Sequence, residues 1–119
     1  MMRSRRQLLI EALEHLAADA MNQEQYLIQL GLSHGIDELA LEFDDIAAAR
    51  DDMLAAHELA LDEHQAIKSI DGALAAMSGE EKSDLWTCTA LVTSTRWIDI
   101  RERAKNCLNL LKRTQGGGL

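Results

Sequence analysis

The fold class is decided by residues 36–77, which read IDELALEFDDIAAARDDMLAAHELALDEHQAIKSIDGALAAM. Apolar side chains recur in this segment every seven residues, which is close to two turns of an α-helix. The repeat consists of Leu39, Ile46, Met53, Ala60, Ile67 and Leu74. Neighbouring apolar side chains widen the stripe to that of a helix facing the core of a bundle, and they are Phe43, Ala47, Leu54 and Leu61.

This segment is too long to form one helix in a compact domain. A helix over residues 36–77 would be about 63 Å long, whereas a domain of this size has a radius of gyration of about 13–14 Å. We therefore expect a break within residues 58–72, where Asp62 could be the N-cap of a new helix and Gly72 is the alternative breakpoint. An unbroken helix would instead predict an elongated hairpin that forms a homodimer.

The whole 119-residue chain has the composition of a helical protein. It contains no proline, one valine and four aromatic residues, together with 19 leucines and 17 alanines, and leucine and alanine favour helices over strands. We predict an all-α fold, built as a single-domain antiparallel bundle of four to five helices with short connections. The helical domain covers residues 1–113, and residues 114–119 form a flexible C-terminal tail because three of them are glycine.

Capping signals predict where the first helix begins and ends. Ser4 can cap its first turn, and Gln7 three residues later completes a capping box. The polar residues 22–25 interrupt the apolar face of this first helix, so a kink is expected there. Gly31 is placed as the C-cap before a turn that ends at Gly35.

Similar signals predict the helices of the C-terminal third. Ser78 and Glu81 have the spacing of a second capping box, so a helix should begin there. Residues 87–95 are rich in threonine and are ambiguous between helix and extended chain. Ser94 or Thr95 then caps a last helix with one apolar face, which consists of Trp97, Ile100, Ala104, Cys107, Leu108 and Leu111.

Charge is distributed unevenly along the chain, whose net charge is −8. Residues 1–10 contain three arginines and no acid, residues 11–95 contain 18 acids and three bases, and residues 96–119 contain six bases and two acids. One interpretation is that the basic ends pack beside the acidic middle and neutralise it. The other is that free acidic surface attracts a basic protein partner by long-range steering. Nucleic acid is disfavoured as a ligand, because its binding depends mainly on neutralising phosphates.

The two cysteines and the apolar runs bear on location. Cys88 and Cys107 lie far apart in the sequence, and a chain with few cysteines and an adequate core is typical of a reducing compartment. No apolar run approaches the length of a membrane span or of a secretory signal. We expect a cytoplasmic protein that does not enter the membrane.

His57 and His64 are the candidate residues for a metal-binding or histidine-dependent role. Seven residues of one helix would separate them by about 10.5 Å, which is too far for both rings to bind one Zn²⁺. A metal would need ligands from other helices, and we predict no cofactor. The stretch from His64 to Ser69 resembles in content the motif of histidine phosphotransfer domains, which are also small acidic helical bundles. Lys68 stands one residue further along than in that motif, which rotates it about 100° around the helix.

Acidic pairs form the strongest pattern outside the predicted core. They recur every seven residues and form what we call the acidic ridge, which consists of Asp37, Glu38, Asp44, Asp45, Asp51, Asp52 and Glu58. On one helix these carboxylates would lie in two neighbouring rows, away from the apolar stripe. Stacked like charges slightly destabilise a helix. The acidic pairs are explained either as a solvated helix face or as a surface that has a function.

These observations predict a small acidic protein-binding module that is not an enzyme. It would engage a basic partner through the acidic ridge, as inhibitors, immunity-type proteins and adaptors do; this choice of class is an analogy from size and charge. The alternative is a bundle that uses His57 or His64 for phosphotransfer or metal binding. A third interpretation is self-association through surplus apolar surface, which would make the protein a homodimer.

Overall fold

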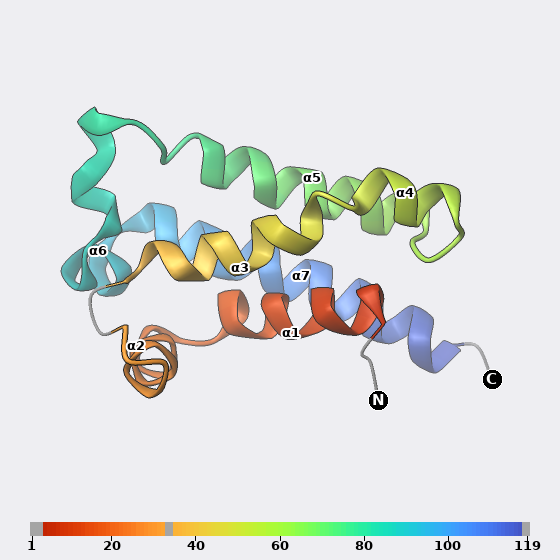
Figure 1. Cartoon of the computed structure of the whole chain (residues 1–119), viewed down its shortest axis with the longest axis horizontal. Helices are drawn as coiled ribbons and strands as arrows, with labels where there is room; N and C mark the ends of the chain where they lie inside the picture. Colours follow the sequence, from red (N-terminus) through yellow and green to blue (C-terminus); the bar gives the residue numbers. More distant parts are fainter. Residues whose placement is uncertain (1–3, 33–34, 118–119) are drawn as a thin grey trace.

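The computed structural model describes residues 4–32 and 35–117, and all regular secondary structure in this part of the chain is helical (Figure 1). It contains seven α-helices and one 3-10 helix, so the all-α fold class is confirmed, whereas a bundle of four to five helices is not. The elements are α1 (Arg5–Ala17), α2 (Ala20–Gln29), α3 (Asp37–Ala47), α4 (Arg50–Ala55), α5 (Leu61–Ala75), η1 (Glu80–Trp86), α6 (Cys88–Thr93) and α7 (Thr95–Gly117).

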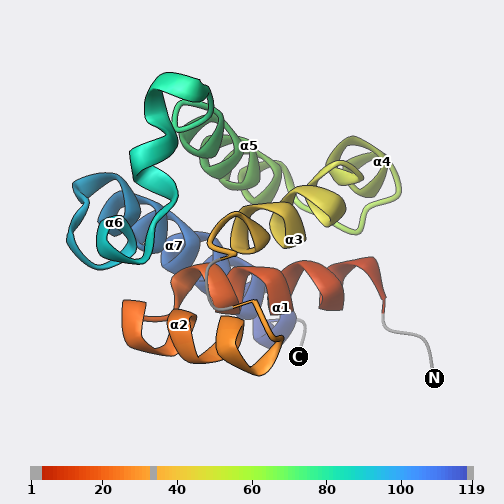
Figure 2. The same cartoon turned by 60° about the vertical axis from the view of Figure 1, so that its left-hand side comes forward.

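The helices pack into one compact body. Its radius of gyration is 14.3 Å and its longest extent is 42 Å, so an elongated hairpin built on a helix of about 63 Å is excluded. Helices α1, α3, α5 and α7 form the main contacts, and α1 and α7 run side by side in opposite directions (Figure 1). The shorter elements α2, η1 and α6 gather at one end, and α4 lies at the other (Figures 1 and 2).

Residues 36–77 form three helices rather than the two that one break would give. The chain is interrupted at residues 48–49 and again at 56–60, so only the second interruption overlaps the predicted interval. Neither predicted breakpoint is used. Gly72 lies inside α5, and Asp62 accepts a hydrogen bond from the next backbone N–H at 2.9 Å rather than capping the helix. The N-cap is Ala60, whose own N–H donates to the Glu63 carboxylate at 2.8 Å.

The second interruption is a Schellman-type turn with a histidine at the left-handed position. His57 has φ +62°, and its N–H donates to the Leu54 carbonyl at 3.1 Å, while the N–H of Glu58 donates to the Met53 carbonyl at 2.8 Å. Glycine usually occupies this position, which is why the sequence did not reveal the turn.

The apolar stripe survives these interruptions only in part. Four of its members are buried, namely Leu39, Met53, Ile67 and Leu74. Ile46 is half-buried and Ala60 is exposed, and Leu61, which we placed in the widened stripe, is 62% exposed. Each interruption resets the rotation of the next helix, so the sevenfold spacing no longer points every member to the core.

The outer helix boundaries follow their capping signals with two exceptions. Ser4 accepts a hydrogen bond from the N–H of Gln7 at 3.0 Å, as predicted. Gly31 has φ +74° and ends the turn as a glycine should, but the C-cap of α2 is Leu30, so Gly31 lies one position beyond its predicted place; residues 33–34 of the expected turn lie outside the described residues. The kink predicted at residues 22–25 is wrong, because the helix ends at Ala17 and Asp19 caps α2.

The second exception is the capping box predicted at Ser78. The helix that follows is the 3-10 helix η1, preceded by Gly79 with φ +118°, and the Ser78 hydroxyl instead donates to the Leu74 carbonyl at 3.4 Å. Of the ambiguous residues 87–95, residues 88–93 form α6, and the flanking Thr87 and Ser94 are extended. Ser94 caps α7, because its hydroxyl accepts from the N–H of Arg96 at 3.2 Å.

The last helix buries the predicted face, since every member except the half-buried Leu108 is shielded from solvent. It continues to Gly117, past the start of the expected tail; residues 118–119 lie outside the described residues, and the flexibility of residues 114–119 stays a prediction. None of the described helices is both long and apolar enough to cross a membrane.

Candidate functional site

The acidic ridge is carried by three segments instead of one helix. Its first four members belong to α3, the next two to α4, and Glu58 to the connection that follows. The prediction of one continuous helical row is therefore wrong. The carboxylates nevertheless stay at the surface: Glu38 and Glu58 are half-buried, and the exposed members are Asp37, Asp44, Asp45, Asp51 and Asp52.

Two members of the ridge, Glu58 and Asp51, contact a basic side chain in the part of the chain that the structure describes. Arg5 forms an ion pair with Glu58, and this contact lowers the pKa of the Glu58 carboxyl. The Nε2 atom of His64 lies 2.8 Å from the Asp51 carboxylate, and this hydrogen bond lowers the pKa of Asp51. The basic N-terminal segment thus packs against the acidic middle, as the first interpretation of the charge pattern expects. Its Arg5 neutralises negative charge only at the Glu58 end of the ridge.

A groove of about 740 Å³ lies beside the ridge, between α3, α5 and η1. We call it the acidic groove, because carboxylates line it together with apolar side chains. Helix α3 contributes Asp37, Leu41 and Asp44, and α5 contributes Asp71 and Leu74. The end of the groove is formed by Ser78, Ser83 and Trp86. Its volume falls within the range of about 300–1,000 Å³ that is usual for ligand sites.

Two carboxyl groups meet on the wall of this groove. Asp71, whose carboxylate lies 3.5 Å from the Arg50 guanidinium, faces Asp44. Although Asp44 is exposed overall, partial desolvation of its carboxyl group raises its pKa, and the charge and hydrogen bond of Asp71 raise it further. Asp44 also lies in the last turn of α3, where the helix dipole disfavours negative charge.

Replacing Asp44 by asparagine is therefore expected to stabilise the protein at pH 7, by a few tenths of a kcal/mol up to about 1 kcal/mol. A pKa that is raised on folding means that the ionised carboxylate costs stability above the folded pKa. The gain should be largest at neutral pH and should vanish as the pH falls below the unfolded pKa, because the carboxyl is then protonated in both states. Urea unfolding at pH 7 and pH 3 measures this. Asp45→Asn, at the exposed neighbour, is the control, and a destabilised Asp44→Asn at pH 7 would contradict the expectation.

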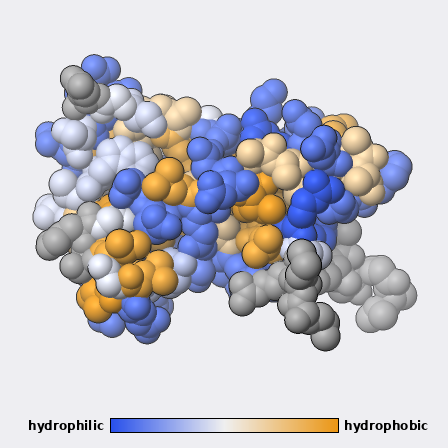
Figure 3. Space-filling model, viewed as in Figure 1, coloured by the Kyte–Doolittle hydropathy of each residue, from blue (hydrophilic) through white to orange (hydrophobic). Residues whose placement is uncertain are grey.

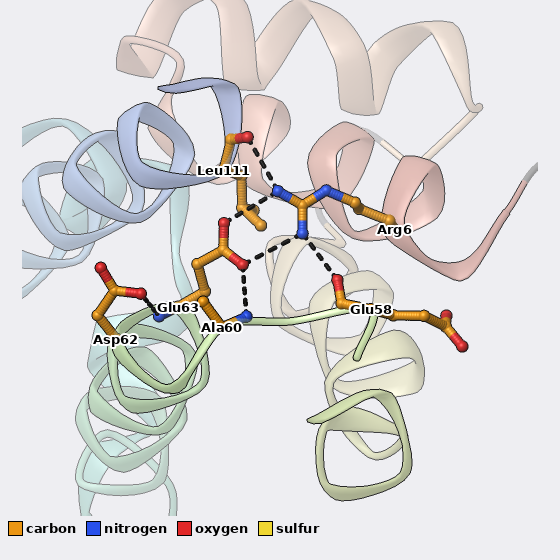
Figure 4. Close-up of polar contacts among 6 residues, drawn as sticks. All are labelled: Arg6, Glu58, Ala60, Asp62, Glu63 and Leu111. Atoms are coloured by element: carbon orange, nitrogen blue, oxygen red, sulfur yellow. Dashed lines mark hydrogen bonds and ion pairs between the residues drawn. The ribbon is translucent and has the colours of Figure 1, made fainter. Parts of the chain in front are cut away.

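The most buried charged side chain among the described residues is that of Glu63, at the start of α5 (Figure 4). The sequence analysis did not identify a buried charge at this position. Glu63 has no exposed surface, and its carboxylate pairs with both terminal nitrogens of Arg6, at 3.2 and 2.9 Å. Arg6 also donates to the carbonyls of Glu58 at 2.7 Å and Leu111 at 3.0 Å. This ion pair joins α1, α5 and α7, so it has a structural role.

A second cluster that the sequence analysis missed joins α1, α2 and α3. The rings of His15 and Tyr26 stack with centroids 3.8 Å apart, and both contact the Glu42 carboxylate. Burial and Glu42 raise the pKa of the Tyr26 hydroxyl. These partners line a pocket of about 360 Å³. Because they are distant in the sequence, no local motif marked them.

The predicted histidine candidates do not share a helical row. His57 lies in the exposed connection after α4 and His64 lies in α5, so the assumed single helix is wrong. Among the described residues, no three histidine, cysteine, aspartate or glutamate side chains are grouped as a metal site would require.

Cys88 and Cys107 do not form a disulfide with each other. Cys107 lies in the core, as predicted, and burial raises its pKa to about 12. Cys88 is half-buried at the start of α6.

The ridge and the acidic groove thus form one surface feature, assembled from α3, α4, α5 and η1. No model of a known protein family, no curated protein and no solved structure matches the chain.

Proposed function

We propose that this protein is a non-enzymatic protein-binding module that engages a basic partner through the acidic ridge of α3 and α4. The observation that carries the proposal is the uncompensated charge of the ridge. Within residues 4–32 and 35–117, no lysine or arginine forms an ion pair with its exposed members on α3 or with Asp52. Repulsion among these carboxylates costs some stability, and a basic surface that docks there would relieve it.

Free charge of one sign has a defined effect on association. It raises the rate at which an oppositely charged protein is encountered and selects against acidic partners. An inhibitor, an immunity-type protein or an adaptor that covers the basic surface of another protein would use the ridge in this way. We include a cytoplasmic location in the proposal, and the lack of a disulfide between Cys88 and Cys107 supports it.

The test is a fourfold substitution of Asp44, Asp45, Asp51 and Asp52 by asparagine. Affinity capture from the native cell with the unchanged protein should retain a basic partner, and the variant should bind it at least about tenfold more weakly at physiological salt. The matched control replaces four other exposed acids by amides, namely Asp62, Asp84, Asp99 and Glu102. Both variants change the net charge equally, so only the position of the charge differs. Undiminished binding by the ridge variant would reject the proposal.

Self-association is supported by a different surface. Helix α2 carries exposed apolar side chains, with Met21 at 73% and Ile28 at 53% exposure, and Figure 3 shows hydrophobic surface gathered over α2 at the lower left. If α2 forms a homodimer interface, the mass in solution should be that of a dimer, and Ile28→Glu should make it that of a monomer.

The histidine-dependent alternative has less support. His57 adopts a left-handed turn conformation, and His64 is engaged with Asp51.

A further inference from the structure

We infer that the acidic groove between α3, α5 and η1 is the seat of one amphipathic helix of the basic partner. The apolar face of that helix would cover Leu41, Leu74 and Trp86, and a lysine or arginine side chain would reach between Asp44 and Asp71. This inference rests on the proposed function and deepens it, because it names the kind of segment that the partner inserts.

The shape of the groove suits a short helical segment. One wall follows α3 from Asp37 to Asp44, and the other follows the last turn of α5 from Asp71 to Ala75 and continues through Ser78 in the connection to η1. The α3 wall rises by about 10.5 Å over these residues, so about two turns of a bound helix fit along it. Helices that bind in this way use apolar side chains three or four residues apart.

The apolar side chains that would contact the partner are already held in position in the groove. Leu41 is 50% exposed at the rim. Trp86 is half-buried at the end of the groove, where its indole N–H donates to the Met77 carbonyl at 2.8 Å. Its ring packs edge-on against Trp97, with centroids 5.5 Å apart and an interplanar angle of 88°. A tryptophan fixed in this way presents a large apolar area with little entropy left to lose on binding.

The charge of the groove selects a cationic helix. Among the residues that the structure describes, its lining contains three carboxylates, those of Asp37, Asp44 and Asp71, and no lysine or arginine. Two cations lie close to the groove. Arg50 already pairs with Asp71 and donates to the Ala47 carbonyl at 3.0 Å, and Lys82 donates to the Ala76 carbonyl at 2.8 Å. The raised pKa of Asp44 has burial and its Asp71 neighbour as causes, so an ammonium or guanidinium group placed between them would relieve an existing cost.

A helix suits this groove better than an extended peptide. The groove walls are helices, whose backbone groups are paired internally, and no strand edge occurs in the described part of the chain. An extended segment would bury its own N–H and C=O groups without partners, which costs free energy, whereas a helix satisfies them itself.

The direct test uses a synthetic 18-residue helical peptide of leucine, alanine and lysine with leucines on one face, and a scrambled peptide of identical composition. At 150 mM salt, calorimetry should show the amphipathic peptide binding at least about tenfold more tightly than the scrambled one. Backbone amide shifts in NMR spectra should change in α3, α5 and η1. Equal binding of the two peptides would overturn the inference, because attraction would then depend on charge alone.

Two substitutions test the groove itself, each with a matched control. Leu41→Ala removes the apolar rim and Ala75→Phe fills the groove, and each should weaken the amphipathic peptide about tenfold or more. Leu61→Ala and Gln65→Phe alter exposed positions outside the groove, and they should leave binding unchanged. Unaltered binding by both groove variants would overturn the inference.

The same variants separate this inference from the proposed function. Asp45, Asp51 and Asp52 lie on the ridge but do not line the groove. If their replacement by asparagine weakens the natural partner while Leu41→Ala and Ala75→Phe do not, the partner uses the ridge alone and the groove inference is rejected. If neither set weakens it, both proposals are rejected.

Discussion

Replacing Glu63 by alanine is expected to lower the free energy of unfolding by about 3 kcal/mol, at the lower end of the range of about 3–5 kcal/mol for breaking a buried ion pair. The substitution leaves the Arg6 guanidinium, whose side chain is 20% exposed, without its carboxylate. The effect is held to the lower end because Arg6 keeps its bonds to two backbone carbonyls. The N–H of Ala60 also loses its acceptor, so the start of α5 should fray.

Urea unfolding followed by circular dichroism measures this loss. The double variant Arg6→Met/Glu63→Leu should recover much of it, because removing both charges avoids a buried, unpaired cation. The matched control is the neighbouring pair of Arg5 and Glu58, which lies closer to solvent, so Arg5→Ala should lower the free energy of unfolding by much less than Glu63→Ala does. Equal losses for Glu63→Ala and Arg5→Ala would show that burial of the first pair contributes nothing.

Local chemistry made the helical class and several boundaries predictable. Ser4 and Gly31 act through neighbours within five residues, so their signals are complete in the sequence. The interruptions of residues 36–77 were not visible in this way. Ala48 and Ala49 favour helix by propensity, and the turn at His57 adjoins Glu58, which Arg5 and Arg6 contact from α1. Contacts across more than 50 residues therefore stabilise a break that local sequence does not encode.

The candidate site likewise has one part that local sequence predicts and one part that depends on contacts between distant residues. The exposure of Asp45 and Asp52 follows from helical spacing and could be predicted. The groove requires α3 and α5 to lie side by side, and the sevenfold repeat had placed their residues on one continuous row. One overlooked signal was present: Glu63 has the spacing of the buried face formed by Ile67 and Ile70. A carboxylate on such a face needs a buried cation, which Arg6 supplies.

Replacing Trp97 by phenylalanine is expected to lower the free energy of unfolding by about 2–3 kcal/mol and to loosen one end of the acidic groove. Trp97 is fully buried, and its indole N–H donates to the Leu85 carbonyl at 2.7 Å. Phenylalanine removes that donor and leaves unfilled volume, and both changes destabilise. Since Leu85 belongs to η1 and Trp86 packs on the Trp97 ring, the loss should spread to the groove.

This variant carries its own reporter, because Trp86 is then the only tryptophan in the chain. Its fluorescence should shift to longer wavelength as its neighbouring ring shrinks, and the amphipathic peptide should bind more weakly. Ile100→Ala is the control, since it creates a cavity in α7 at a buried position that does not line the groove and costs about 2–5 kcal/mol. Peptide binding should survive Ile100→Ala and decline with Trp97→Phe. An equal decline in both would mean that the groove depends on overall stability and not on the support that Trp97 gives to η1.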